Sequence, residues 1–580
     1  MNPPERFEIG TRPAAARSTG APADSPPPPP PPPPRARAAV GDHYLVALLI
    51  AGAVAIILVG IRSSVYDLDR YSFPKAMVLH GVALLALPVL LARWRRIELG
   101  SVDALLVAFV GWSAVAALLA RNHWLALAGF GLSFSGLIVY LAARQIAPAR
   151  GRALIAALAF AGALGSSLGV AQAYGANWSF LATTRPPGGT FGNRNFLAHL
   201  TAIAVPLLLL VRLRARRRLP AFLAAVGLAV AAAAIVLTRS RAAWLGLAAG
   251  LVVMLLSTAI GWRAIRSAAD RPRRRLRGAL LALAVGTAAA VLLPNTLDWR
   301  ASNPYAQTLN RLTDYRGGSG RGRLIQYRNS AKMLKYDPVF GVGPGNWFVY
   351  YPRVTTPRDP AYDVNDPIPT NPWPSSDWVT FAVERGPVGA LLLLAALAAA
   401  ALAALLALGR RDGGPADGAP RAADAALATR DRALGAAALL GALAAAVVCG
   451  LFDAVLLLPA PTFFVFAALG TLLPPPRRAA VYRPLGGGTR TVASLAALVL
   501  ALGLVATTAG QLYALIITRD STSRRTIDQA LTYDPGDYRL YLLLLGRGSC
   551  GPHGAYARGA AHLLPYHALP RRALRQCHVR

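Results

Sequence analysis

Long apolar stretches recur along almost the whole of this 580-residue chain. Each has roughly 18 or more apolar residues, the length that an α-helix needs to cross a hydrocarbon core of about 30 Å. Only 15% of the residues are charged, whereas a soluble protein of ordinary composition has about 25%. The sequence therefore predicts an all-α, polytopic membrane protein.

The apolar stretches divide into about thirteen predicted transmembrane helices, each about as long as a bilayer requires. They cover residues 44–60, 75–92, 102–120, 124–143, 153–174, 196–211, 220–237, 242–261, 278–294, 388–408, 433–456, 460–474 and 492–517.

Arginine-rich connections follow every second predicted helix. Because basic residues collect in cytoplasmic loops, one orientation places all of these connections inside, with the N-terminus cytoplasmic and the C-terminus outside. The net charge of +35 then reflects membrane topology, and no nucleic-acid partner is expected. The basic connections are residues 93–96, 144–152, 212–218, 271–277, 409–412 and 474–483.

This orientation gives five predicted segments. The first is a disordered, proline-rich cytoplasmic tail, because an unbroken run of prolines cannot form a packed core. A loop as long as the third segment is rarely passive inside a compact protein. The segments are the tail at 1–42, helices one to nine at 43–294, a large outer loop at 295–387, helices ten to thirteen at 388–518 and an outer helical tail at 519–580.

Several arginines lie on the predicted outer side, where the positive-inside tendency does not explain them. A guanidinium group is permanently charged and donates paired hydrogen bonds to phosphate oxygens. We therefore expect a pyrophosphate to bind at the outer membrane surface. The alternative for Arg239 and Arg241 is that they extend from helix ends toward the interface. The candidates are Arg194, Arg239, Arg241, Arg323 and Arg328.

The three cysteines have no metal-ligand spacing, and no histidine lies in the long outer loop, so no metal and no cofactor are predicted. Cys550 and Cys577 both fall in the outer tail, where an oxidising environment would allow a disulfide, and Cys449 lies inside an apolar span. The tail also repeats loosely, since residues 530–544 and 560–574 match with an offset of 30. This pattern is typical of a degenerate tetratricopeptide (TPR-like) unit.

Four motifs occur in order and together resemble the O-antigen ligase and polymerase family of membrane glycosyltransferases. They are "GGTFGNRNFLAHL" at 188–200, "TRSRAAWLGL" at 238–247, "GRLIQYRNSAKMLKYDPVFGVGPGNW" at 322–347 and "SSDWVTFAVERGPVGALLL" at 375–393. "YSFPKAM" at 71–77 fits as well, and the likeness covers roughly residues 45–475.

The resemblance implies a GT-C-like, metal-independent enzyme of surface polysaccharide biosynthesis in the bacterial inner membrane. Its donor would be a glycan on undecaprenyl pyrophosphate, transferred at the periplasmic face to lipid A core, another glycan or a protein. The outer arginines would hold the pyrophosphate. The start of the helix near Phe196 would add a favourable field for that anion.

One position departs from the family. Its ligases carry a histidine before the glutamate that matches Glu384, and the corresponding residue here is Ser375. Serine is no general base near neutral pH. Asp377 or Glu384 could replace it as a catalytic carboxylate, the acceptor could need no strong base, or activity could be lost. For Asp377 the alternative role is a helix N-cap.

Two other functions stay open at this stage. A transporter or flippase of lipid-linked glycans would carry charged residues in mid-span, and the spans here are almost free of them. An inactive family member could act as a scaffold in which the tail recruits partners.

Overall fold

The computed structural model describes residues 35–61, 69–93, 99–178, 185–266, 272–311, 318–356, 359, 362, 372–409, 422–475 and 487–578. The predicted proline-rich segment lies outside the described residues up to residue 34, and the first helix begins at Arg35.

A helix is present at each of the thirteen predicted spans. Twelve helices of the described chain are long and apolar enough to cross a membrane, and α17 is a shorter apolar helix of 14 residues. The spans are α1 (Arg35–Leu58), α2 (Asp69–Arg93), α3 (Ser101–Leu118), α4 (His123–Arg144), α5 (Pro148–Ala173), α6 (Arg194–Arg214), α7 (Arg218–Thr238), α8 (Arg241–Ile260), α10 (Pro272–Leu292), α15 (Gly386–Leu408), α16 (Ala422–Phe452), α17 (Pro459–Leu472) and α18 (Gly487–Ile517).

The remaining helices are short and lie in connections or in the C-terminal tail. They are α9 (Trp262–Arg266), α11 (Pro304–Asn310), α12 (Gly318–Ala331), α13 (Trp347–Tyr350), α14 (Asp377–Glu384), α19 (Arg524–Tyr533), α20 (Tyr538–Gly546), α21 (Ala555–Leu563) and α22 (Ala568–Gln576). With helices as the only regular elements in the described ranges, the predicted all-α polytopic fold class is confirmed.

The helix α6 is the centre of the bundle. It packs against α5, α7, α8 and α16, and all its residues from Phe196 to Leu210 are buried. By contrast, α18 packs mainly along α2, and its other side leaves apolar residues such as Val492 and Val499 exposed. A helix that is apolar on its exposed side is suited to contact with lipid.

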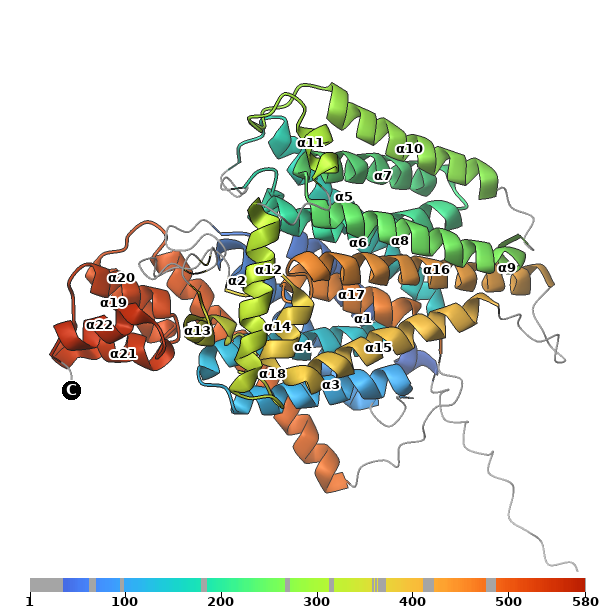
Figure 1. Ribbon diagram of the computed structural model, residues 1–580. Coiled ribbons are helices and arrows are strands. Elements are labelled where there is room, and N and C mark those ends of the chain that lie inside the picture. Colours follow the sequence, from blue (N-terminus) through green and yellow to red (C-terminus); the bar gives the residue numbers. More distant parts are fainter. Residues whose placement is uncertain are drawn as a thin grey trace, which may run out of the picture. The chain divides into compact units, whose positions relative to one another are not determined.

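The two ends of the bundle bring different connections together. We call one the basic end, where Asp42, Arg93 and residues 144–152, 212–214 and 430–431 meet. The other, the tail end, carries α11, α12 and the C-terminal tail (Figure 1). Described residues of five of the six predicted cytoplasmic connections have contacts at or beside the basic end, as the antiparallel order of the helices requires.

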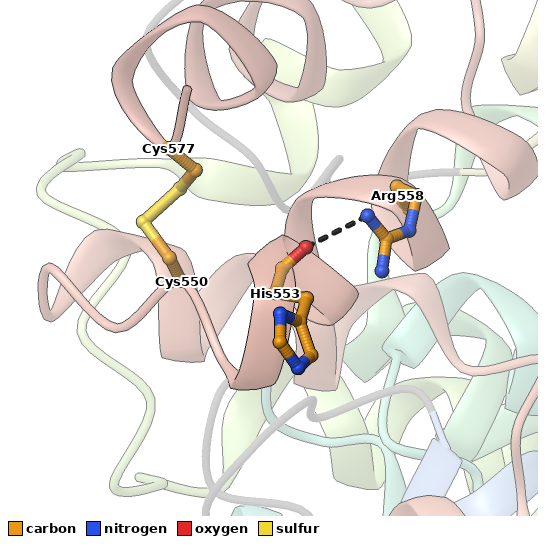
Figure 2. The surroundings of a disulfide bond; sticks show 4 residues. All are labelled: Cys550, His553, Arg558 and Cys577. Atoms are coloured by element: carbon orange, nitrogen blue, oxygen red, sulfur yellow. Dashed lines mark hydrogen bonds between the residues drawn. A yellow bond between two sulfur atoms is a disulfide. The ribbon is translucent and has the colours of Figure 1, made fainter. Parts of the chain in front are cut away.

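The C-terminal tail consists of two helical hairpins, α19 with α20 and α21 with α22. The structure joins Cys550 and Cys577 in a disulfide, so the pairing that the sequence left open is made (Figure 2). The tail packs on the 295–387 loop through Phe348, whose ring stacks on Tyr538 and whose carbonyl oxygen lies 3.0 Å from His567 Nε2. The tail therefore rests on the membrane domain itself.

Candidate functional site

Two of the five predicted arginines meet at one indole ring. The guanidinium carbons of Arg194 and Arg239 lie 4.6 and 4.8 Å from the centre of the Trp299 ring. The two residues begin α6 and follow α7, and Trp299 belongs to the loop after α10. Cations stabilised by one aromatic ring can stay close together without a carboxylate between them.

The backbone at Arg239 is held in a left-handed conformation, with φ at 51°. Such a conformation costs a residue with a Cβ about 1–2 kcal/mol, so the surrounding structure must maintain it. The guanidinium is fixed by two neutral groups of α11, since Nε donates to Thr308 Oγ1 at 2.8 Å and Nη2 donates to Gln307 Oε1 at 3.0 Å. This arrangement positions the charge without neutralising it.

A pocket of about 240 Å³ adjoins these residues. Its lining includes Arg185, Asn193, Arg194 and Trp299, together with Asp298, which is largely exposed. The indole Nε1 of Trp299 is buried and has no hydrogen-bond partner within the described ranges. We call this place the Trp299 pocket; it offers guanidinium groups and an unused N–H donor, which suits an anion.

The start of α6 is already capped. The helix begins at Arg194, two residues before the predicted Phe196, and the Asn193 side chain accepts from the backbone N–H of Asn195 at 2.9 Å. The N–H of Arg194 donates to the carbonyl oxygen of Arg185 at 3.2 Å. The helix thus adds its field to the pocket, but these amides are not available as donors to a ligand.

The other three predicted arginines have different surroundings. Arg241 donates to the carbonyl oxygen of Arg311 at the end of α11, close to the groups that hold Arg239. Arg323 pairs with Asp453 at 4.0 Å, and Asn195 donates to the same carboxylate at 3.1 Å. Arg328 is exposed on α12, and no contact within the described ranges joins it to the Trp299 pocket.

The motif at residues 71–77 holds in place the glycine-rich loop at 188–193, which directly precedes α6. Gly192 has φ at 71°, and a Cβ there would lie 2.2 Å from the Tyr71 ring, so only glycine fits. Lys75 donates from Nζ to the carbonyl oxygens of Ile56 at 2.8 Å and Val59 at 2.9 Å, and it lies 4.6 Å from the Phe191 ring centre. The motif therefore fixes the loop that carries Arg194.

Asp377 is fully buried at the start of α14. Its two carboxylate oxygens accept backbone N–H groups from Val455 at 2.9 Å and Leu456 at 2.8 Å, which join α14 to the turn between α16 and α17. The N-cap of α14 is the neighbouring Ser376, whose hydroxyl accepts from Val379 N–H. Burial raises the pKa of Asp377 to about 7, and the backbone donors offset part of that rise.

Glu384 closes the same short helix and is also buried. Its carboxylate accepts from the N–H groups of Gly345 at 2.8 Å and Trp347 at 3.2 Å and pairs with Arg385 at 3.4 Å. Burial raises its pKa, and Arg385 opposes the rise. The glycine-rich segment at 341–345 thus packs as a tight turn against the α14–α15 junction.

The sequence did not single out His199. It is fully buried one turn after Asn195 on α6, and its ring lies within reach of the backbone of Ala454. Asp453 and Arg323 both act on it electrostatically. The one sequence signal that could have pointed to His199 was its spacing from Asn195, because residues four apart share a helix face.

Among the described residues, no group of three or more histidine, cysteine, aspartate and glutamate side chains is arranged so that it could hold a metal ion.

The fold and this site define a multi-pass membrane protein with an arginine-lined pocket at one end of its helical bundle. Residues 226–394 match the family model described as O-Antigen ligase, a segment that includes three of the four motifs quoted above. Over these residues the match confirms the predicted resemblance to the O-antigen ligase and polymerase family of surface polysaccharide biosynthesis. No curated protein matches the chain.

Proposed function

We propose that this protein transfers a glycan from polyprenyl pyrophosphate to an acceptor at the outer, periplasmic face of the bacterial inner membrane, and that the Trp299 pocket holds the pyrophosphate. One observation carries the proposal. Arg194 and Arg239 are kept together at Trp299 without a carboxylate partner among the described residues, beside a pocket large enough for a ligand.

Holding two such charges together without a counter-ion is unfavourable, since like charges repel. A diphosphate removes this cost because its oxygens accept paired hydrogen bonds from guanidinium groups. As a leaving group it also becomes more negative as the glycosidic bond breaks. Fixed cations near the bridging oxygen would therefore stabilise the transition state more than the bound donor.

The two carboxylates have different parts in this proposal. Glu384 lines a cavity beside α14, so it is the better candidate to accept the acceptor's proton once a hydroxyl displaces one of its backbone contacts. Asp377 holds the turn after α16 and acts as a positioning residue. Arg241 and Arg323 support the pocket from α8 and α12, and Arg328 would contact the donor's outer sugars from its exposed position.

The test is transfer by purified protein reconstituted in vesicles with a polyprenyl-pyrophosphate glycan, followed by release of the lipid carrier. We expect the double substitution Arg194→Ala, Arg239→Ala to reduce turnover by at least about 100-fold. Arg217→Ala is the matched control, because it removes an exposed charge at the basic end and should leave turnover unchanged.

Retained donor affinity in a correctly folded double variant would refute the pyrophosphate assignment. Donor binding without any released carrier in the unsubstituted protein would favour the inactive scaffold. Movement of the intact lipid-linked glycan across the vesicle membrane would favour the flippase.

A further inference from the structure

A second cavity, of about 210 Å³, opens at the tail end of the bundle. On α2 its lining runs from Asp69 at the helix start to His80, which at 1.5 Å per residue corresponds to a depth of about 16 Å. On α18 it runs from Gln511 to Leu504. It therefore extends from the outer rim toward the middle of the membrane, and we call it the α18 cavity.

The α18 cavity differs from the Trp299 pocket in charge. Its lining includes the carboxylates of Asp69, Glu384, Asp534 and Asp537 against the guanidinium groups of Arg385 and Arg539. Both guanidinium groups are occupied. Arg539 lies 2.6 Å from Asp69 and 2.7 Å from Asp537, while Arg385 contacts Glu384 and donates to the carbonyl oxygen of Gly129 at 3.0 Å. Neither guanidinium group is therefore free to hold a phosphate, whereas an uncharged ligand needs no such charge.

The rim has the chemistry that recognises sugars. Trp124 and Trp373 line it, and flat aromatic rings pack against the C–H faces of sugar rings. The Nε1–H of Trp373 is buried and unpaired within the described ranges, so it can donate to a hydroxyl oxygen. Carboxylates at the same rim can accept from hydroxyl groups.

The inner part of the cavity is lined mainly by apolar side chains. Leu127, Leu132, Leu457 and Leu504 line it, and the wall made by α18 borders the side of the bundle whose apolar residues are exposed. A hydrocarbon chain fits such a space and could enter it from the surrounding lipid. The polar rim and the apolar depth together match an amphiphile whose sugar faces outward.

The cavity also lies beside the Trp299 pocket. The Trp373 ring is 6.5 Å from the ring of Phe196, which is two residues after Arg194 in α6. Two sites that exchange a glycan must be neighbours, because the acceptor hydroxyl has to reach the sugar carbon bonded to the pyrophosphate.

We propose that the α18 cavity is the acceptor subsite, that it binds an uncharged saccharide carried on a hydrocarbon chain, and that α18 and the C-terminal tail form its selective walls. This inference rests on the proposed function, because only a glycan transferase has an acceptor. Neither wall belongs to the segment matched by the family model.

The experiment uses the full chain in lipid nanodiscs and a dodecyl glucoside with a diazirine in its alkyl chain. We expect saturable photolabelling of α4 or α18 that excess inorganic pyrophosphate does not reduce. Leu504→Trp should fill the cavity and weaken labelling at least about tenfold, since Leu504 is 1% exposed and lines the cavity. The matched control Leu502→Trp changes a residue of the same helix that is 50% exposed, and it should label normally.

Trp373→Phe keeps the ring but removes the N–H donor, so it should weaken labelling by the glucoside severalfold while dodecanol with the same diazirine labels as before. Equal labelling of the Leu504→Trp and Leu502→Trp variants would overturn the proposal. So would displacement of the probe by polyprenyl phosphate at lower concentration than by unlabelled glucoside, since the cavity would then take the donor's chain. The double variant Arg194→Ala, Arg239→Ala should label normally, so loss of donor binding there is independent of this result.

Discussion

Four arginines at the basic end and two at the tail end of the bundle have different kinds of partner. At the basic end, Arg93 and Arg150 share Asp42 at 2.7 and 3.1 Å, and Arg152 and Arg214 share Asp431 at 3.6 and 3.9 Å. At the tail end, Arg194 and Arg239 face an indole ring and neutral side chains.

The difference teaches that the same residue type has two uses in this protein. The paired arginines join helix ends, and carboxylates of the same chain neutralise their charge. The arginines at Trp299 have no carboxylate partner among the described residues, which leaves a positive field that would favour the proposed diphosphate.

A carboxylate partner for Arg239 would remove the difference between the two ends. Gln307→Glu places one within 3.0 Å of the guanidinium with almost no change of shape. We expect donor affinity and carrier release to fall by about 30- to 100-fold, with unchanged thermal stability, because the new ion pair competes with the diphosphate. Steady-state transfer in vesicles measures this, and Gln307→Met is the uncharged control. An unchanged rate would mean that the field at Arg239 is not used.

Docking of the tail gives a pH-dependent test of the tail end. Burial lowers the pKa of His567 to about 4, and the nearby Arg571 acts in the same direction. An unfolded histidine titrates near 6.5, so the docked tail is fully stable above that pH and loses stability as the pH falls toward 4. Opening of α21 and α22 should increase about tenfold per pH unit in this window.

Hydrogen exchange, corrected for the intrinsic pH dependence of the amide rate, measures that opening. His567→Gln should remove the slope, because glutamine can bond to the Phe348 carbonyl without titrating. A slope of the same size in the variant would assign the pH dependence to another group.

Removing a partner at the basic end should affect stability alone. Asp42→Asn leaves Arg93 and Arg150 without their shared carboxylate, and we expect a loss of about 1 kcal/mol in unfolding free energy, since these groups are partly exposed. Thermal unfolding in detergent and donor binding should be measured on the same sample. Weaker donor binding in a stable Asp42→Asn protein would erase the proposed distinction between the two ends.

The smallest effect is expected at the ring that joins the two arginines. Trp299→Phe keeps an aromatic face but weakens the cation–π attraction and removes the unpaired N–H, so donor affinity should fall about threefold to tenfold. Trp262→Phe, in α9, is the control for loss of an indole. A Trp299→Phe protein with full affinity would show that the ring only spaces the arginines.

Much of the fold could be predicted because its signals are local. The thirteen predicted spans correspond to helices, and the pairing of Cys550 with Cys577 is made within one tail. The start of α6 was predicted two residues late because the cap depends on the Asn193 side chain, and apolar content cannot locate a cap. The helix α17 is likewise shorter than a full membrane span, although it is apolar enough for one.

The site was less predictable because partners come from distant parts of the chain. Asp377 meets the backbone of residues 455–456, Arg323 meets Asp453, and His199 lies under the same two charges. Nothing in the sequence near these residues indicates those contacts. Residue type alone thus could not separate the carboxylate that lines a cavity, Glu384, from the one that fastens a turn, Asp377.

The sequence by itself determined that this chain enters a membrane many times and which connections are basic, because hydrophobic length and loop charge act locally and need no folded partner. Only the tertiary structure decided which arginines are neutralised and which two are brought to Trp299. Electrostatic attraction depends on distance in space, and that distance is set by helices packing together from opposite parts of the chain.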